Sequence, residues 1–284
     1  MGAAVRLCFL VEDQYRDDVM PLHVARHLLA TGHEVDIVEP GRGVVRIDEL
    51  LARGHDAWVL KTVSGGPGLS LFDAAAAAGI PTVNDARAVH TVRDKTVAAA
   101  IARRHGLPFP PTRFVAAADL LHRFDGGPLV VKPVAGDSGR GVHIVRSARD
   151  LREARGALHR EGFLLVQPYV PNPGVDVKVY SVAGDLHATV RTSPLHPDRP
   201  VETREIPLPD DLAALVSRIG EVYDLDLFGI DAVEGPDGWT IVDVNDFPSF
   251  RGVPDAVPRV AAAVLRLADA RHGRLGTRAV TARR

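Results

Sequence analysis

Short apolar runs alternate with amphipathic segments along the first third of the chain. The apolar runs have the length and composition of buried strands and cover residues 6–11, 34–38, 57–61 and 80–83. Helices are expected between them at 20–31 and 71–78, each followed by a glycine, Gly32 and Gly79. Strands that alternate with helices favour a parallel sheet with helices on its faces. We therefore predict an α/β domain over residues 1–88.

The pattern changes after a domain joint that we place near residues 84–92. An alanine-rich helix is expected from about 94 to 105, with Gly106 as its stop and a proline-rich segment after it. Strands then dominate, at 128–134, 141–145, 163–170, 175–191, 227–233 and 239–245. Helices are expected at 151–160, 212–223 and 257–271. This order favours an α+β body after the α/β start.

We divide this body at residue 165, into one subdomain over 89–165 and a second over 166–275. Residues 276–284 are basic and lack an apolar period, so we predict a disordered tail there.

The composition of the chain excludes several kinds of binding partner and metal site. The chain of 284 residues is 46% hydrophobic and 25% charged with a net charge of −2, so no overall positive field attracts nucleic acid or an anionic membrane. A single cysteine, Cys8, excludes an internal disulfide and a thiolate metal cage. Residues 1–13 do not fit a signal peptide, because Arg6 interrupts a short apolar run. We predict a soluble cytoplasmic protein.

A turn signal, EGPDG at 234–238, joins two of the strands and predicts a hairpin. If the turn is centred near Asp237, Asp231 faces Asp243 directly, and Asn245 shares that face because side chains alternate along a strand. The opposite face is expected in the core and carries Ile230, Ala232, Val242 and Val244.

Two carboxylates about 5 Å apart repel each other unless a cation or a proton separates them. Oxygen ligands suit a hard ion such as Mg²⁺, which shares phosphate oxygens with a nucleotide. The alternative reading of this hairpin is an exposed face with ordinary acids.

Two further segments carry candidate phosphate and purine contacts. In PLVVKPVAGDSGRGVHIV, Lys132 precedes a loop whose glycines would let backbone amides close over phosphate oxygens. No helix follows the loop, so it is not a P-loop, and by itself it could be a mobile hairpin loop. In LLVQPYV, Tyr169 could offer a flat surface to a purine, or the strand could simply be core.

A second hairpin turns at residues 183–185. Asp176, Lys178 and Tyr180 share one face of it, and Arg191 could join them from the opposite strand. Lysine and arginine that converge on a Mg²⁺ site are what phosphoryl chemistry needs, because negative charge develops on the transferring oxygens. Taken singly, each would be a surface base.

The chain resembles the ATP-grasp superfamily over about residues 91–270, and most of all its RimK-like branch. The motifs follow the order and approximate spacing of that superfamily: DKTVAAAIARRHGLPFPPT, VVKPVAGDSGRGVHIV, LLVQPYV, VDVKVY, TVRT, LFGIDAV and VDVNDFPS. The resemblance implies an α/β N-terminal domain followed by an α+β ATP-grasp fold whose two subdomains clasp the nucleotide. It also implies a ligase that joins a carboxylate of an amino acid or peptide to an amine through an acyl phosphate.

The resemblance further implies the roles of the site residues. Lys95 and Lys132 would contact the phosphates of ATP, under a loop that contains Ser138 and Gly139. The adenine pocket would be lined by Gln167, Tyr169 and Val170, with Asp176 near the nucleotide. Mg²⁺, or Mn²⁺ in its place, would bind Asp231, Asp243 and Asn245. The catalytic cations would be Lys178 and Arg191.

Several positions depart from the ligase pattern. Asp243 stands where many ligases have Glu, and Pro168 replaces the Glu of the hinge, which removes a carboxylate and an N–H group. Lys178 replaces an Arg, which is not an equivalent donor. The loop after Asn245 reads DFPSF in place of a turn of small residues, so an unusual acceptor site is expected.

The same departures resemble the inositol-phosphate kinases of the superfamily, which use Asp, Asp and Asn at the metal. Such a kinase needs a dense basic pocket. The chain offers few bases for it: Lys61, Lys178, Arg191 and one of Arg199 or Arg251. The ligase is therefore the preferred hypothesis, the kinase of a polyol phosphate is the alternative, and a nucleotide-binding module without turnover is the second alternative. A homo-oligomer is compatible with each of them.

Overall fold

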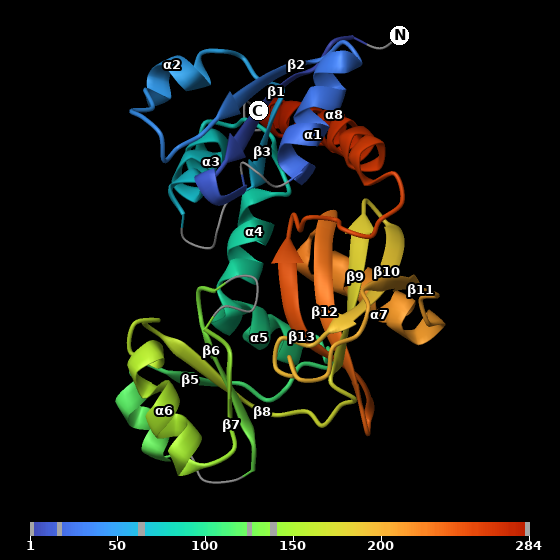
Figure 1. Cartoon of the computed structure of the whole chain (residues 1–284). Helices are drawn as coiled ribbons and strands as arrows, with labels where there is room; N and C mark the ends of the chain where they lie inside the picture. The colour runs from blue at the N-terminus through green and yellow to red at the C-terminus, as the bar shows by residue number, and fades with distance from the viewer. Residues whose placement is uncertain (1–2, 16–18, 62–65, 124–126, 137–140, 282–284) are drawn as a thin grey trace.

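The computed structural model describes residues 3–15, 19–61, 66–123, 127–136 and 141–281. Three sheets make up this part of the chain, one at the top, one at the right and one at the lower left of Figure 1. The prediction of an α/β domain followed by an α+β body is confirmed.

The N-terminal domain is a parallel sheet in the order β2-β1-β3-β4. Its strands are β1 (Arg6–Val11), β2 (Glu34–Val38), β3 (Ala57–Lys61) and β4 (Thr82–Val83). Its helices are α1 (Val19–Ala30), α2 (Ile47–Leu51), which we did not predict, and α3 (Pro67–Ala77). Alternate residues of β1 enter opposite layers: Phe9 packs toward α1, and Cys8 packs toward α3. Burial raises the pKa of the Cys8 thiol to about 12, as befits a core residue.

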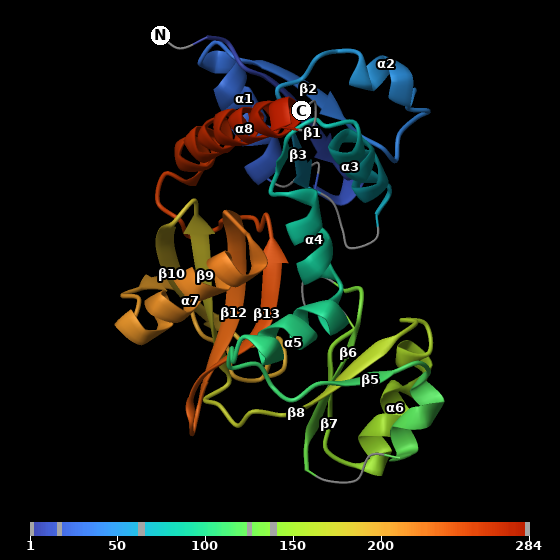
Figure 2. The same ribbon diagram turned by 180° about the vertical axis from the view of Figure 1, so that it is seen from behind.

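The last helix, α8 (Ala256–Thr281), returns to this domain and packs beside α1. Figure 2 shows it crossing the N-terminal sheet on the side opposite α3. The helix therefore extends beyond the predicted end at residue 271, as far as residue 281, and the disordered tail over residues 276–284 stays a prediction. Alanine, leucine and arginine favour a helix even where no apolar period continues. No helix in the described part of the chain is long and apolar enough to cross a membrane.

The predicted joint at residues 84–92 is a helix, α4 (Ala86–Arg93), and a second helix, α5 (Lys95–Arg104), follows directly. Asp94 separates them: its side chain accepts hydrogen bonds from the backbone N–H groups of Thr96 and Val97 and so caps α5. The two N-caps, Asp85 and Asp94, are the signals for two helices here. The N-terminal domain is thus connected to the rest by regular structure.

The central sheet is antiparallel in the order β5-β8-β6-β7. Its strands are β5 (Arg113–Val115), β6 (Leu129–Pro133), β7 (His143–Val145) and β8 (Leu164–Pro168). One face packs against α6 (Ala148–Leu158) and a 3₁₀ helix (Ala118–Arg123). Strand β8 belongs to this sheet, so the structural boundary lies after residue 168 and not at residue 165.

The C-terminal sheet has five antiparallel strands in the order β11-β10-β9-β12-β13. They are β9 (Val175–Val182), β10 (Asp185–Thr192), β11 (Arg204–Ile206), β12 (Leu227–Gly235) and β13 (Gly238–Asp246). Helices α7 (Asp210–Tyr223) and α5 contribute to the core against one face. The other face carries the polar side chains of the candidate site.

Asn84 joins the N-terminal domain to the C-terminal sheet. This buried amide donates to the carbonyl of Leu227 at 2.7 Å and accepts from the N–H groups of Asp226 at 3.1 Å and Leu227 at 2.8 Å. Asn84→Ala is expected to reduce the free energy of unfolding by about 3 kcal/mol, because two buried backbone groups and one partly buried backbone group lose their partner. Urea denaturation measures the change.

Asp85→Ala is the matched control, because it removes the N-cap of α4 and a contact with the exposed Arg87 side chain, and it should cost about 1 kcal/mol. Equal losses for the two variants would contradict the role assigned to Asn84.

Candidate active site

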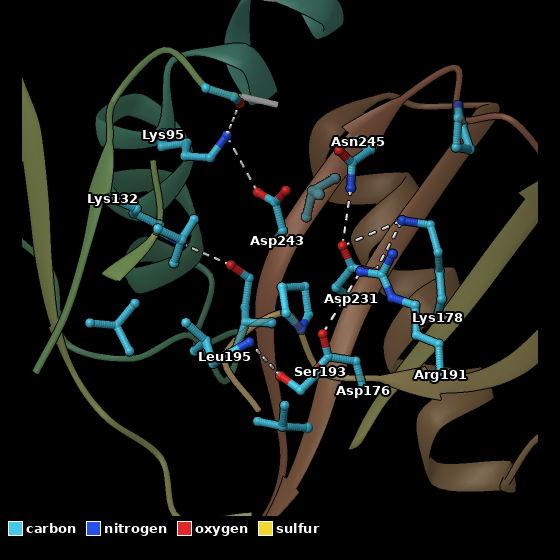
Figure 3. A pocket seen from close by; sticks show the side chains of 18 of the residues that line it. Lys95, Lys132, Asp176, Lys178, Arg191, Ser193, Leu195, Asp231, Asp243 and Asn245 are labelled. Carbon is cyan, nitrogen blue, oxygen red and sulfur yellow. Dashed lines mark hydrogen bonds and ion pairs between the residues drawn. The ribbon is translucent and has the colours of Figure 1, made fainter. Parts of the chain in front are cut away.

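A cavity of about 780 Å³ lies between the central and C-terminal sheets, and residues of the N-terminal domain and α4 line it as well. In Figure 3 the lysines of the central sheet and α5 lie on one side of it, and the acidic and amide side chains of β12 and β13 face them. The predicted site residues within the described ranges all line this cavity: Lys95, Lys132, Gln167, Tyr169, Val170, Asp176, Lys178, Arg191, Asp231, Asp243 and Asn245. Ser138, Gly139 and most of the predicted glycine flap lie outside the described residues.

The hairpin of β12 and β13 has the predicted register only from Asp231 away from the turn, because near the turn Ala232 is paired with Ile241 and not with Val242. Asp231 is paired with Asp243, and the amide of Asn245 lies 3.5 Å from a carboxylate oxygen of Asp231. The register shifts after Asp231 through a β-bulge, and Val242 is the extra residue. The prediction that Val242 points into the core is wrong, because this residue of the bulge lines the cavity and lies outside the apolar cores, whereas Ile230, Ala232 and Val244 are in the core, Val244 at the cavity wall.

Asp231 is the most heavily bonded carboxylate of the site. It is 7% exposed and accepts hydrogen bonds from Lys178 at 3.0 Å and Arg191 at 2.9 Å. Burial alone would raise the pKa of Asp231, but the charges of Lys178 and Arg191 outweigh it and hold the pKa below its ordinary value. This carboxylate therefore stays ionised among its cations.

The opposite wall brings two lysines to Asp243. Lys95 Nζ lies 3.5 Å from a carboxylate oxygen of Asp243 and donates to the carbonyl of Gly136 at 2.7 Å. Lys132 is 8% exposed and donates to the carbonyl of Val242 at 2.9 Å. Burial lowers the pKa of Lys132 to about 8, and Lys95 adds to this, although Asp243 and Asp231 oppose it. The β-bulge thus supplies a carbonyl that holds Lys132.

Asp176 lies on β9 opposite Arg191 of β10, as predicted. The Arg191 guanidinium is 3.8 Å from its carboxylate. Burial raises the pKa of Asp176, although a hydrogen bond with Ser193 opposes the shift. Asp176 and Arg191 therefore form the part of the polar face next to Ser193.

Several hydrogen bonds fix the hinge after β8, residues 168–171. The N–H group of Tyr169 donates to the carbonyl of Pro128 at 2.8 Å, and its hydroxyl lies 2.8 Å from Nε2 of His196. Gln167 donates to the hydroxyl of Thr112 at 2.8 Å. Pro168 and Pro171 have no N–H group, and Tyr169 uses its own, so only Val170 keeps a backbone N–H for a ligand between residues 168 and 171.

The donor set fits Mg²⁺. In the described part of the chain, no group of three or more His, Cys, Asp or Glu residues could hold a metal ion. Mg²⁺ does not need such a cage, because it usually takes one or two carboxylates together with waters and phosphate oxygens. Asp231, Asp243 and Asn245 supply two carboxylates and an amide oxygen on one face, next to lysines suited to phosphate.

Contacts made by α4 and by the N-terminal domain were missing from the predicted site residues. Arg93 of α4 binds the carboxylate of Asp246 through two hydrogen bonds, at 2.9 and 2.8 Å. Lys61 of β3 donates to the carbonyl of Phe247 at 2.8 Å. Arg251 lines the cavity, whereas Arg199, offered as its alternative, is not among the lining residues. Long-range pairs such as these leave no local pattern in the sequence.

Two sheets that face each other across lysines and acids, with a hinge between them, define an ATP-grasp protein. The chain belongs to the RimK-like ATP-grasp family, because the RimK-like ATP-grasp domain matches residues 92–265. The family predicted from the motifs is thereby confirmed.

Curated relatives are named as ligases. A probable alpha-L-glutamate ligase of Thioalkalivibrio sulfidiphilus is 26% identical over 257 residues, which are 80% of this chain and 83% of that protein. A second, from Parasynechococcus marenigrum, is 27% identical over 203 residues. That match covers 66% of this chain but only 43% of the relative.

Solved structures share the fold. A RimK domain ATP-grasp protein of Sphaerobacter thermophilus superposes with a TM-score of 0.71 at 24% identity and covers 92% of this chain and 100% of its own. The D-cycloserine synthetase DcsG superposes with a TM-score of 0.70 at 20% identity, over 92% of this chain and 99% of its own. At these identities the likeness establishes the ATP-grasp fold.

Proposed function

We propose that the chain is an ADP-forming ligase that uses ATP and Mg²⁺ to join a carboxylate to an amine. The observation that carries the proposal is one cavity in which Lys95 and Lys132 face Asp243, beside Asp231 and its two cations. Membership of the RimK-like family and the names of the two relatives above, each a probable alpha-L-glutamate ligase, support a ligase over a kinase.

The reaction follows from the groups that the cavity brings together. An oxygen of the substrate carboxylate attacks the γ-phosphorus of ATP, ADP leaves, and an acyl phosphate forms. The amine then attacks the acyl carbon, and inorganic phosphate leaves. Both steps create charge on phosphate oxygens, so catalysis rests on fixed positive charge and on positioning.

The side chains of the cavity have different roles in this reaction. Lys95 and Lys132 hold the phosphates from the central sheet side, and Lys178 and Arg191 offset charge from the side of the C-terminal sheet. Mg²⁺, held by Asp231, Asp243 and Asn245, would supply further positive charge to the phosphate oxygens, and Mn²⁺ could replace it. Gln167, Tyr169 and Val170 form the adenine end, with the N–H of Val170 as the donor to the base and Asp176 near the nucleotide. Ser138 and Gly139 would cover the phosphates.

An isotope experiment tests the reaction. The purified chain is given MgATP, an amine, and an amino acid or peptide labelled with ¹⁸O in its carboxylate. We expect ADP release that needs both substrates, a new amide, and transfer of one ¹⁸O atom to inorganic phosphate.

Other outcomes would overturn the proposal. A new phosphate ester with an inositol phosphate would identify a kinase, and nucleotide binding without turnover of any pair would identify a binding module. The cytoplasmic location and a homo-oligomeric state remain predictions.

A further inference from the structure

Gln167 of β8 is a buried amide in the cavity wall, and only one end of it is bonded. The residue is 5% exposed and lines the cavity. Its Nε2 donates to the hydroxyl of Thr112 at 2.8 Å. Its carbonyl oxygen accepts no hydrogen bond from the described residues. An amide oxygen that is largely out of water is costly unless a donor reaches it. This oxygen is therefore available to a donor in the cavity.

The strands around Gln167 place it between the cavity and Thr112. Leu164 and Val166 of β8 enter the core against α6, so the side chain of Gln167 lies on the opposite face of the sheet. The pairing of Arg113 with Val166 continues by one residue and brings Thr112 opposite Gln167. Thr112 itself is not among the lining residues of the cavity.

Thr112 decides which end of the Gln167 amide faces the cavity. A hydroxyl group has one proton to donate and two lone pairs that accept. Thr112 donates its proton to the carbonyl of Pro110 at 2.9 Å. The hydroxyl can then only accept from Gln167, so the NH₂ group of the amide must face Thr112. The carbonyl oxygen is thereby turned away from Thr112.

The segment that carries Thr112 is rigid. Pro108, Pro110 and Pro111 each have a restricted φ angle. The N–H group of Ile241 in β13 donates to the carbonyl of Pro108 at 2.9 Å. This chain of prolines is therefore anchored to the C-terminal sheet, and it presents Thr112 to Gln167 at a fixed position.

Gln167 and the hinge together offer a donor and an acceptor to a base. The proposed function gives the N–H group of Val170 to the base as a donor. The carbonyl of Val170 already accepts from Nδ2 of Asn172 at 2.8 Å. Adenine has an amino donor at position 6, whereas guanine and hypoxanthine have an oxygen acceptor there. A fixed acceptor at Gln167 therefore suits adenine and opposes a 6-oxopurine.

We propose that Thr112 is a positioning residue for the selection of the base. It holds the Gln167 amide so that the carbonyl oxygen accepts from the 6-amino group of adenine and repels the oxygen of a 6-oxopurine. This inference rests on the proposed use of ATP and deepens it, because it names the groups that distinguish ATP from GTP or ITP. Thr112 acts only through Gln167, since it has no contact with the cavity of its own.

Calorimetric titration with MgADP and MgIDP tests the selection without turnover. We expect wild type to bind ADP about 100-fold more tightly than IDP, because a site built for a hydrogen bond rejects a ligand that cannot form it. Thr112→Val keeps the size of the side chain and removes the hydroxyl. The amide can then rotate about its last torsion and donate to the oxygen at position 6.

The ratio of the two Kd values is the quantity that Thr112→Val should change. We expect it to fall about 10-fold, the range for one hydrogen bond, with the Kd of ADP within about threefold of wild type. Thr112→Ser keeps the hydroxyl and should keep the wild-type ratio. A purely structural role of Thr112 would weaken ADP and IDP binding alike and leave the ratio unchanged.

A double-variant cycle shows whether Thr112 acts through Gln167. Gln167→Met should also lower the ratio, and Thr112→Val added to it should bring no further change. Thr31→Val is the control and should keep the wild-type ratio. Its hydroxyl also bonds backbone carbonyls, those of His27 at 2.9 Å and Leu28 at 3.1 Å, but it lies outside the cavity lining.

The outcomes separate base selection from the ligase reaction. Equal binding of ADP and IDP by wild type, a wild-type ratio in Thr112→Val, or a further loss in the Gln167→Met background would each overturn the role of Thr112. None of these results affects the ligase, which is judged by its amide product. Absence of any amide product would reject the ligase, whereas the titrations still measure the choice of base.

Discussion

Replacing Lys132 by methionine is expected to slow ATP turnover about 100- to 1000-fold and, at pH 7, to make the folded chain more stable. The loss of activity follows from the removal of a fixed positive charge beside Asp243 and the proposed phosphate site. The gain in stability follows from burial, which lowers the pKa of Lys132 from 10.5 to about 8. Such a shift corresponds to a penalty on the order of 3 kcal/mol for keeping the ammonium charged in the folded state.

The direction in which stability changes with pH follows from the lowered pKa of Lys132. Between pH 8 and 10.5 the unfolded chain holds the Lys132 proton and the folded chain does not, so this lysine makes wild-type stability rise with pH in that window. The advantage of Lys132→Met should therefore be full below pH 8 and disappear toward pH 10.5. Urea denaturation at a series of pH values measures it.

Two observations check the Lys132 prediction independently. The Cε resonance of Lys132 should titrate with a midpoint near pH 8, and phosphate charge should raise that midpoint when MgAMPPNP binds. Lys95→Met is the matched control, because Lys95 forms an ion pair with Asp243 and its loss should bring no comparable gain in stability. A Lys132→Met variant that is less stable than wild type at every pH would contradict the prediction.

Asp231→Asn and Asp243→Asn are expected to lower activity to a similar extent but stability to different extents. Asp231 is the counter-ion of Lys178 and Arg191, so its neutralisation leaves buried positive charge and should cost about 3–5 kcal/mol. The side chain of Asp243 is 22% exposed and has one ion pair, with Lys95 at 3.5 Å. Its neutralisation should cost at most about 1 kcal/mol. Both variants should lose about 100-fold or more of the ATP turnover if both carboxylates serve the metal.

The stability of the protein at acid pH offers a second check on Asp231. Its pKa is lowered in the folded state, so its contribution to stability is present above the unfolded value near 3.9 and is lost as the pH falls through the folded pKa. Urea denaturation from pH 7 to pH 3 should show this loss for wild type and Asp243→Asn, but not for Asp231→Asn. Equal destabilisation of both variants at pH 7 would show that Asp231 is not the structural counter-ion.

The sequence alone determined the hairpin that carries the candidate metal ligands. A five-residue turn signal predicts the hairpin, and alternation predicts that Asp231, Asp243 and Asn245 share one face of it. The shared face was therefore predictable, and so was the parallel N-terminal sheet, whereas the direct pairing of Asp231 with Asp243 depends on the bulge at Val242. The order of the motifs likewise fixed the family.

Only the tertiary structure decided how the charges are shared and what closes the cavity. Val242 faces the cavity through a bulge that alternation cannot reveal, and Lys132 binds a carbonyl 110 residues away. The apolar face of α8 could have covered any apolar surface, and it packs on the first domain of the chain. Lys61 reaches Phe247 across 186 residues. Local patterns encode which face a side chain takes, but contacts between distant segments depend on packing, which selects one partner among many that are chemically equivalent.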